Sequence, residues 1–89
     1  MRSAHNLKVH ELIGLAARIT KSSSRQWIGL EGKVIDETKN LLVLETKNGE
    51  KRIPKNSCTF LFTLENGEKA ELEGKEIAFR PEERTKKAL

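Results

Sequence analysis

Two Asn-Gly pairs constrain the fold of this sequence more than any other feature. Asn48-Gly49 and Asn66-Gly67 each lie between segments with the character of β-strands, and such pairs readily adopt the positive φ angles of type I′ hairpin turns. Lys39-Asn40 marks another tight connection. Turns that recur at intervals of about 9 to 18 residues predict an all-β meander of antiparallel strands.

The segments between these turns show the alternation expected of strands. Apolar and mostly polar residues alternate over 15–20, 28–34 and 58–64, while residues 41–44 form a continuous apolar run. Alternation gives a strand one face for a core and one face for solvent, and a continuous apolar run is typical of a central strand. The sequence therefore predicts several strands around one core.

Glycines within these segments indicate strong curvature. Gly29, Gly32 and Gly74 lie in stretches of strand character, where glycine permits a bend or a close approach of backbones. Near Gly74 the alternation of apolar residues changes phase, which indicates a bulge or a sharp bend. We expect a small, strongly bent antiparallel β-barrel over residues 15–79, because closure removes exposed strand edges.

Short helices are expected at both ends of the chain. Asn6 can cap a helix that runs through Leu12, within an N-terminal extension over residues 1–14. Pro81 suits a first helical position, and the acidic residues that follow it and the lysines near the end match the helix dipole. Residues 80–89 are therefore expected to form a basic C-terminal helix or tail.

The composition limits the chain to one small domain. Of its 89 residues, 36% are hydrophobic and 34% are charged, which suits one core with a solvated exterior. Cys58 is the only cysteine, so an internal disulfide and a zinc site built on thiolates are excluded. The sequence has neither an apolar run of membrane-spanning length nor, in residues 1–10, the apolar stretch of a signal peptide. We expect a cytoplasmic protein with no membrane partner.

The distribution of charge favours a polyanionic partner. The net charge is +4, and residues 1–40 hold seven basic residues against four acidic ones. Residues 41–79 hold six against seven, and residues 80–89 hold four against two. The basic excess therefore lies at the two ends and around the first strands, as in proteins that bind nucleic acid.

Nothing in the sequence supports an independent active site. Asp36 is the only aspartate, and the glutamates mostly alternate with lysines, so the carboxylate cluster of a two-metal nuclease is missing. His5 and His10 do not share a helical face well, which suggests surface or packing roles. Cys58 alternates in phase with Phe60 and is expected in the core rather than as a nucleophile. We expect no catalytic residue, no bound metal and no cofactor on this chain.

Two clusters of basic residues are the candidates for RNA binding. One lies on the first strand and its loop, the other lies just beyond the first Asn-Gly turn, and a closed barrel could place both toward the same side. The full set is Arg18, Lys21, Arg25, Lys39, Lys51, Arg52, Lys55, Lys86 and Lys87. Base stacking needs exposed aromatic rings, and Trp27 is the one aromatic residue not expected in the core. It either plugs the end of the barrel or stacks on a base or a partner.

The segment from Gly29 to Leu44, GLEGKVIDETKNLLVL, resembles the central motif of protein component 1 of archaeal ribonuclease P. That family is related to a eukaryotic subunit shared with ribonuclease MRP. Four further blocks agree with the family in content and order. They are HELIGL upstream at 10–15, and IPK at 53–55, FLFTL at 60–64 and RPEER at 80–84 downstream. A single short block would carry little weight, but five blocks in order are specific.

The same segment is similar to the first Sm motif, with Gly32, Val34, Asp36 and Asn40 at the motif positions. This similarity implies an Sm-like barrel, in agreement with the glycines and the alternation. In Sm proteins the loop that carries the aspartate and asparagine contacts a base. A convincing second Sm motif is missing, so ring assembly and uridine binding are not carried over.

The family resemblance also implies a function. It implies an RNA-binding subunit of ribonuclease P that supports the catalytic RNA in 5′-end maturation of precursor tRNA, with Mg²⁺ held by the RNA. The implied partners are the ribonuclease P RNA, precursor tRNA indirectly, and a small zinc-binding protein subunit on which the termini become ordered. The candidate residues for protein partners are Leu7, Leu12, Ile13, Trp27, Arg80 and Arg84.

Three alternatives remain open at this point. The chain could be an Sm-like or ribosomal-type RNA-binding barrel of another ribonucleoprotein, which identification of the associated RNA would separate. It could be an interaction protein whose charge serves only solubility, which salt-dependent RNA binding would argue against. A free-standing nuclease is the third alternative, and the missing carboxylate cluster argues against it.

Overall fold

The computed structural model describes Leu7, residues 11–80 and residues 82–83. These residues form six strands and three short 3-10 turns. The strands are β1 (Ala16–Ser22), β2 (Glu31–Glu37), β3 (Leu41–Thr46), β4 (Gly49–Pro54), β5 (Cys58–Thr63) and β6 (Lys69–Glu73), and the turns are η2 (Arg25–Trp27), η3 (Lys55–Ser57) and η4 (Gly74–Ile77). Every neighbouring pair of strands is antiparallel, which confirms the prediction of an all-β antiparallel chain.

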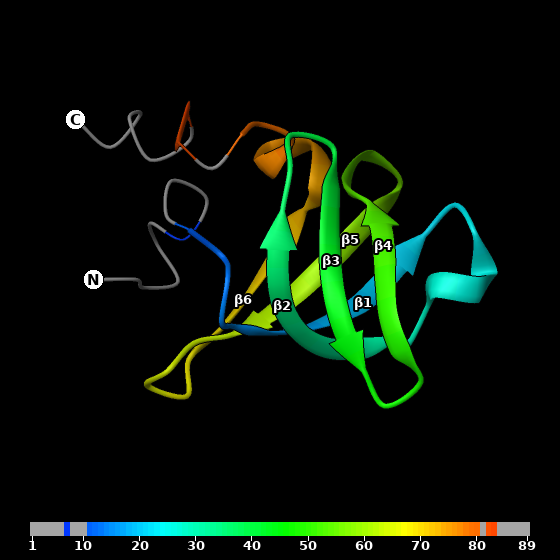
Figure 1. Ribbon diagram of the computed structural model, residues 1–89, viewed down its shortest axis with the longest axis horizontal. Coiled ribbons are helices and arrows are strands. Elements are labelled where there is room, and N and C mark those ends of the chain that lie inside the picture. Colours follow the sequence, from blue (N-terminus) through cyan, green and yellow to red (C-terminus); the bar gives the residue numbers. More distant parts are fainter. Residues whose placement is uncertain (1–6, 8–10, 81, 84–89) are drawn as a thin grey trace.

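The strands form one curved sheet in the order β4-β3-β2-β1-β5-β6. Figure 1 shows β2, β3 and β4 running upright in front of β1, β5 and β6, which cross behind them obliquely. The strand β2 curves strongly as it passes from one half of the sheet to the other. The sheet therefore folds over itself, and the core lies between its two halves.

The prediction of a closed Sm-like barrel is wrong. β4 and β6 are the two edges of the sheet, and no ladder joins them in the part of the chain that the structure describes. The edge strands instead run into the turns η3 and η4, which pack against each other. A Cβ atom on Gly74 would overlap the carbonyl oxygen of Lys55. The two edges therefore meet through turn backbones, not through strand pairing.

The predicted terminal helices are a second correction. The described residues contain 3-10 turns of three or four residues and no helix of the predicted length. The N-terminal segment instead contributes individual buried side chains, since Leu7 and Leu12 are both fully buried. Most residues on which the helices were predicted lie outside the described part, namely 1–6, 8–10, 81 and 84–89.

The two Asn-Gly hairpins form where predicted but with a different backbone. Gly49 and Gly67 have φ angles of +99° and +89°, whereas no described residue other than glycine has a positive φ. A type I′ turn would require positive φ at the asparagine as well. In the second hairpin the Gly67 N–H donates to the Leu64 carbonyl at 2.9 Å. This is the pattern of a type I turn followed by a left-handed glycine.

Of the three glycines predicted to lie within strands, Gly32 alone does so. A Cβ atom there would overlap the carbonyl oxygen of Glu45 on β3, which confirms the expected close approach. Gly29 lies in the turn before β2 with a φ of +85°, and Gly74 begins η4. The change of phase near Gly74 is therefore the end of β6, not a bulge within a strand.

One continuous core joins the two halves of the sheet. Phe60 and Phe62 of β5 stack with their ring centroids 5.8 Å apart, and both are fully buried. Cys58 is also buried, which confirms its predicted place in the core. The other members of the core are Leu7, Leu12, Leu15, Ala17, Ile19, Val34, Leu42, Leu44, Ile53, Leu64, Ala70 and Ile77.

Candidate RNA-binding surface

A β-bulge in β1 places Arg18 and Lys21 on the same face of the sheet. Successive side chains of a regular strand point to opposite faces, so residues three apart would diverge. Here Thr20 is an extra residue, because Arg18 lies opposite Leu61 while Lys21 lies opposite Thr59. Cross-strand partners share a face, and Leu61 and Thr59 alternate with the buried residues of β5. Both basic side chains therefore lie on the outer face.

The outer face around Arg18 is of mixed charge. Glu31 on β2 lies opposite Arg18, and Glu71 on β6 lies in the same cross-strand row on the other side. Acidic residues thus flank the arginine. Positive charge is concentrated farther along, at Lys21 and at the exposed Arg25 in η2. The first predicted cluster is therefore strongest at the C-terminal end of β1.

The second predicted cluster is divided between the two faces of β4. Lys51 lies opposite Leu44, a fully buried core residue, and is itself half-buried. Its neighbour Arg52 lies opposite Val43 on the outer face and is exposed. Lys39 is exposed in the turn between β2 and β3. Because β2 and β3 separate β4 from β1 in the sheet, the two clusters do not form one continuous strand surface.

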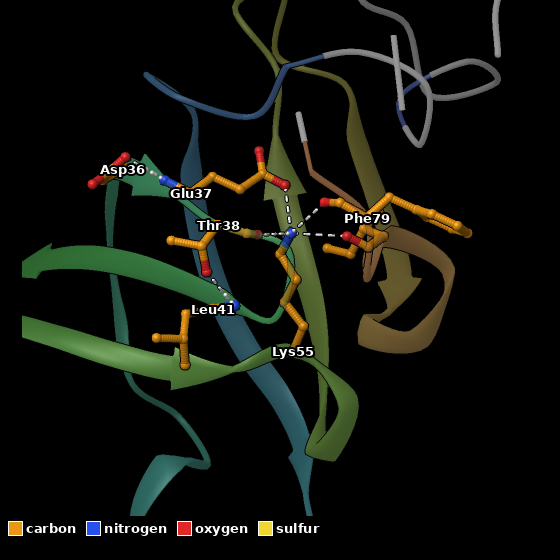
Figure 2. A network of polar contacts seen from close by, with 7 residues as sticks. Asp36, Glu37, Thr38, Leu41, Lys55 and Phe79 are labelled. Atoms are coloured by element: carbon orange, nitrogen blue, oxygen red, sulfur yellow. Dashed lines mark hydrogen bonds and ion pairs between the residues drawn. The ribbon is translucent and has the colours of Figure 1, made fainter. Parts of the chain in front are cut away.

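Lys55, a candidate for RNA binding, is buried inside the protein. Its Nζ donates hydrogen bonds to Glu37 Oε2 at 2.7 Å and to the carbonyl oxygens of Thr38, Ile77 and Phe79 at 2.6, 2.8 and 3.2 Å. Figure 2 shows these acceptors converging on the ammonium from the β2–β3 turn and from the segment around η4. Neither side chain of the Lys55–Glu37 pair has exposed surface, so this lysine is not available to an RNA phosphate.

A second bulge, in β2, turns Glu37 toward Lys55. The pairing of β2 with β3 shifts between Val34 and Asp36, which makes Ile35 the extra residue. Without it, alternation from the buried Val34 would turn Asp36 inward and Glu37 outward. In the structure Glu37 is buried and Asp36 is exposed. The bulge therefore determines that Glu37, and not the adjacent Asp36, points into the interior.

Sequence reasoning missed the Lys55–Glu37 pair, although a signal for it was present. Val34 and Ile35 are adjacent apolar residues that interrupt the alternation of β2, and two acids follow them directly. Such an interruption is the pattern that a bulge leaves in a strand. Lys55 itself follows Ile53-Pro54, and proline limits further pairing of a strand.

Two hollows on the outer face lie next to basic residues of β1. One of about 320 Å³ is lined by residues of β1, β2, β5 and β6, among them Ala16, Arg18 and Gly32. Another of about 330 Å³ lies at the end of β1 and includes Lys21. The outer face is therefore not smooth where its basic side chains emerge.

Comparison with known proteins gives the family. Residues 5–87 match the family described as ribonuclease P/MRP, subunit p29. The chain belongs to this family. The resemblance expected from the sequence is thereby confirmed, and the match covers nearly the whole chain.

Two relatives of this p29 family member are of similar length to it. Ribonuclease P protein component 1 of Methanosphaera stadtmanae is 45% identical over 87 residues, which cover 98% of this chain and 94% of the relative. The protein of the same name from Methanocaldococcus jannaschii is 46% identical over 90 residues, covering 100% and 94%. A solved structure described as Mth11, a homologue of human RNase P protein Rpp29, is 45% identical with a TM-score of 0.63, covering 84% of this chain and 97% of its own.

The residues predicted to bind a protein partner of the p29 subunit lie in different environments. Leu7 and Leu12 are fully buried in the chain's own core and so present no surface to a partner. Ile13 is 43% exposed, Trp27 is half-buried against the core, and Arg80 is exposed. Arg84, the remaining candidate for a protein partner, lies outside the described residues, as do the RNA-binding candidates Lys86 and Lys87.

Two negative findings apply to the described part of the p29 subunit. Its residues include no group of three His, Cys, Asp or Glu side chains placed to hold a metal ion. Across residues 7, 11–80 and 82–83, no helix has the length and apolar character needed to cross a membrane.

Proposed function

We propose that this chain is protein component 1 of an archaeal ribonuclease P, an RNA-binding subunit that supports the catalytic RNA in 5′-end maturation of precursor tRNA. The family match over residues 5–87 carries the proposal. Relatives of nearly equal length that bear the name ribonuclease P protein component 1 support it. As a subunit of this complex, the chain takes part in tRNA processing.

Within this proposal, Arg18, Lys21 and Arg25 are the primary RNA contacts. The bulge in β1 supports this assignment, because it aligns the first two on the outer face next to the turn that holds the third. Lys39 and Arg52 are exposed and are secondary contacts. Basic side chains that neutralise phosphates supply affinity and position the protein without reading base sequence.

The catalyst in this proposal is the RNA with its bound Mg²⁺, and the protein acts by binding. Exposed lysines and arginines are suited to relieve repulsion between phosphates of a folded RNA. A purified chain without RNA should leave precursor tRNA intact in Mg²⁺. Cleavage that follows the protein through several columns, and survives nuclease treatment that removes RNA, would overturn this assignment.

Reconstitution is the decisive experiment. Precursor tRNA, the ribonuclease P RNA from the same genome and the other protein subunits are combined with and without this chain at limiting Mg²⁺. We expect faster cleavage at the mature 5′ end when the chain is present. An unchanged rate, together with recovery of a different RNA when the chain is isolated from cells, would favour an RNA-binding subunit of another ribonucleoprotein.

We also propose a small zinc-binding ribonuclease P protein as a direct partner. Figure 1 places the described beginning of the chain and the segment after η4 at the same end of the molecule. Ile13 belongs to the first of these segments and Arg80 to the second, and both are exposed, which suits a docking surface with one apolar and one charged contact. Ile13→Asp should weaken co-elution of the two proteins, and equal co-elution of wild type and variant would contradict this surface.

A further inference from the structure

The hollow of about 330 Å³ at the end of β1 is built from four parts of the chain. They are the last residues of β1 with the loop after it, the turn η3, the start of β5, and the junction of β6 with η4. The turn η3 and the start of β5 are contiguous, so the lining comes from three stretches that are separated in the sequence, 21–23, 56–59 and 73–75, and the hollow exists only in the folded protein. The candidates found from the sequence include one of its residues, Lys21.

The lining of this hollow is rich in groups that can donate hydrogen bonds to an anion. Its ammonium, hydroxyl and amide groups come from Lys21, Lys75, Ser23, Ser57, Thr59 and Asn56. Hydroxyl, amide and ammonium groups are the side-chain donors that proteins use toward phosphate oxygens. The sulfur of Cys58 lies at the wall but belongs to the core.

The charges around the hollow sum to one excess positive charge. Glu73 is the acidic residue of the lining, and its Oε2 lies 3.1 Å from Lys75 Nζ. That pair is neutral as a unit, and Lys21 adds one positive charge on the opposite wall. A phosphodiester carries one negative charge, so it matches the excess.

Backbone contacts hold the walls of the hollow in place. The Ser23 N–H donates to the Ser57 carbonyl at 3.0 Å, which ties the loop after β1 to η3. The Ser24 N–H donates to Ser22 Oγ at 3.0 Å, which fixes the loop itself. On the far side Gly74 packs directly against the backbone of η3. Walls held in this way need little backbone rearrangement when a ligand binds.

We infer that this hollow binds a phosphodiester of the RNA backbone. Lys21 supplies the excess charge, and Lys75, although paired with Glu73, adds a second ammonium donor. The Asn56 side chain supplies hydrogen bonds, and the Ser57 hydroxyl would turn to the phosphate from the Pro54 carbonyl, to which it donates at 3.3 Å in the structure. The inference rests on the proposed function, because it names one contact point of the same RNA-binding subunit. A phosphate held at this point would fix the register of the RNA along β1, since phosphate contacts position a nucleic acid without reading its sequence.

The test compares two double variants of equal charge in binding to the ribonuclease P RNA at several salt concentrations. Lys21→Gln with Lys75→Gln removes both lysine charges of the lining and leaves Glu73, so the net charge of the hollow changes from +1 to −1, while Lys33→Gln with Lys47→Gln removes two lysine charges from exposed positions elsewhere. If one phosphate is bound, the first variant should reduce the slope of log affinity against log salt by about one unit. The control should change the slope by less than half as much.

A second measurement locates the contact without relying on charge. Asn56→Ala with Ser57→Ala leaves the net charge unchanged, and it should weaken RNA binding severalfold while the melting temperature stays within a few degrees. In spectra of the isotope-labelled wild type, addition of a short RNA hairpin should shift the backbone amide signals of Ser23, Asn56 and Ser57.

The outcomes separate the two proposals. Equal slopes for the two charge variants, with the amide signals unmoved, would overturn the phosphate site while RNA binding by the subunit stands. The same result is expected if a carboxylate of a protein partner fills the hollow instead. Absence of salt-dependent RNA binding by the wild type itself would overturn the proposed function.

Discussion

The bulges in β1 and β2 move charged side chains in opposite directions. In β1 the extra residue Thr20 brings Lys21 to the outer face. In β2 the extra residue Ile35 brings Glu37 into the interior, where it meets Lys55 at 2.7 Å. The first bulge makes a charge accessible to a partner, and the second confines a charge pair to the protein.

This difference shows that the role of a lysine here depends on strand phase more than on its place in a basic run. Lys21 is exposed, and Lys55 is enclosed by the carboxylate and carbonyl oxygens described above. Breaking a buried ion pair costs about 3–5 kcal/mol, whereas an exposed charge contributes about 0–1 kcal/mol to stability. Replacement of Lys55 should therefore lower the free energy of unfolding, whereas replacement of Lys21 should weaken RNA binding with little effect on stability.

The largest effect is expected from Lys55→Met. This change removes the ammonium that lies 2.7 Å from the buried Glu37 carboxylate and that donates to the carbonyl oxygens of Ile77 and Phe79. The free energy of unfolding should fall by about 3–5 kcal/mol, measured by chemical denaturation followed by circular dichroism.

The matched control removes both charges of the buried pair. Lys55→Met combined with Glu37→Leu replaces the ion pair by apolar side chains and should recover much of the lost stability, since a buried pair can often be replaced at little cost. A double variant as unstable as the single one would show that the carbonyl contacts, and not the ion pair, make Lys55 important.

A smaller loss of stability is expected from Gly32→Val, beside the second bulge. The new Cβ atom would overlap the Glu45 carbonyl oxygen across the β2–β3 pair, so the strands would have to separate at a cost of about 1–3 kcal/mol. The control is Ala16→Val, at an exposed position on the neighbouring strand. Equal melting temperatures of the two variants would show that the close approach at Gly32 is incidental.

At the first bulge the expected effect is on RNA binding and not on stability. Replacement of Arg18, Lys21 and Arg25 by Ala should reduce the salt slope of RNA binding by about two to three units, since each phosphate contact contributes about 0.7–0.9. The free energy of unfolding should change by less than about 1 kcal/mol, because these side chains are exposed. Replacement of Lys33, Lys47 and Lys69 by Ala is a control that removes the same charge. An equal loss of salt slope in this control would show that the RNA does not preferentially contact Arg18, Lys21 and Arg25.

The smallest effect is expected from Thr20→Val at the extra residue of β1. Thr20 Oγ1 donates to Glu71 Oε2 at 2.8 Å in an exposed position, so its loss should cost about 0.5–1 kcal/mol. RNA binding should be unchanged, because the register of β1 and β5 still turns Lys21 outward. A marked loss of RNA affinity would mean that the hydroxyl, and not the register, positions the lysine.

Much of the fold could be predicted because it depends on local signals. The turns at Gly49 and Gly67 and the core positions Phe60 and Phe62 follow from turn chemistry and alternation. The open edges could not be predicted, because closure depends on how η3 and η4 pack after strands distant in sequence have paired.

The candidate site was less accessible to sequence reasoning for a related physical reason. A bulge moves every later residue of its strand to the opposite face of the sheet. The positions of the lysines in the sequence alone do not show on which face each one lies. Lys21 was grouped with Arg18 by proximity in the sequence, and the bulge does place both on the outer face. Lys55 was assigned to the surface because its partner Glu37, eighteen positions away, was not recognised. The hollow with Lys75 was missed because its walls come from three separate stretches of the sequence.

The buried ammonium of Lys55 also has a consequence for folding kinetics. Its acceptors Glu37, Ile77 and Phe79 lie 18, 22 and 24 positions away in the sequence, so its shell is complete only after the last strand and η4 have docked. Interactions that form after the transition state slow unfolding and leave the folding rate almost unchanged. We therefore expect the contacts of Lys55 to form late in folding, so that Lys55→Met mainly raises the unfolding rate.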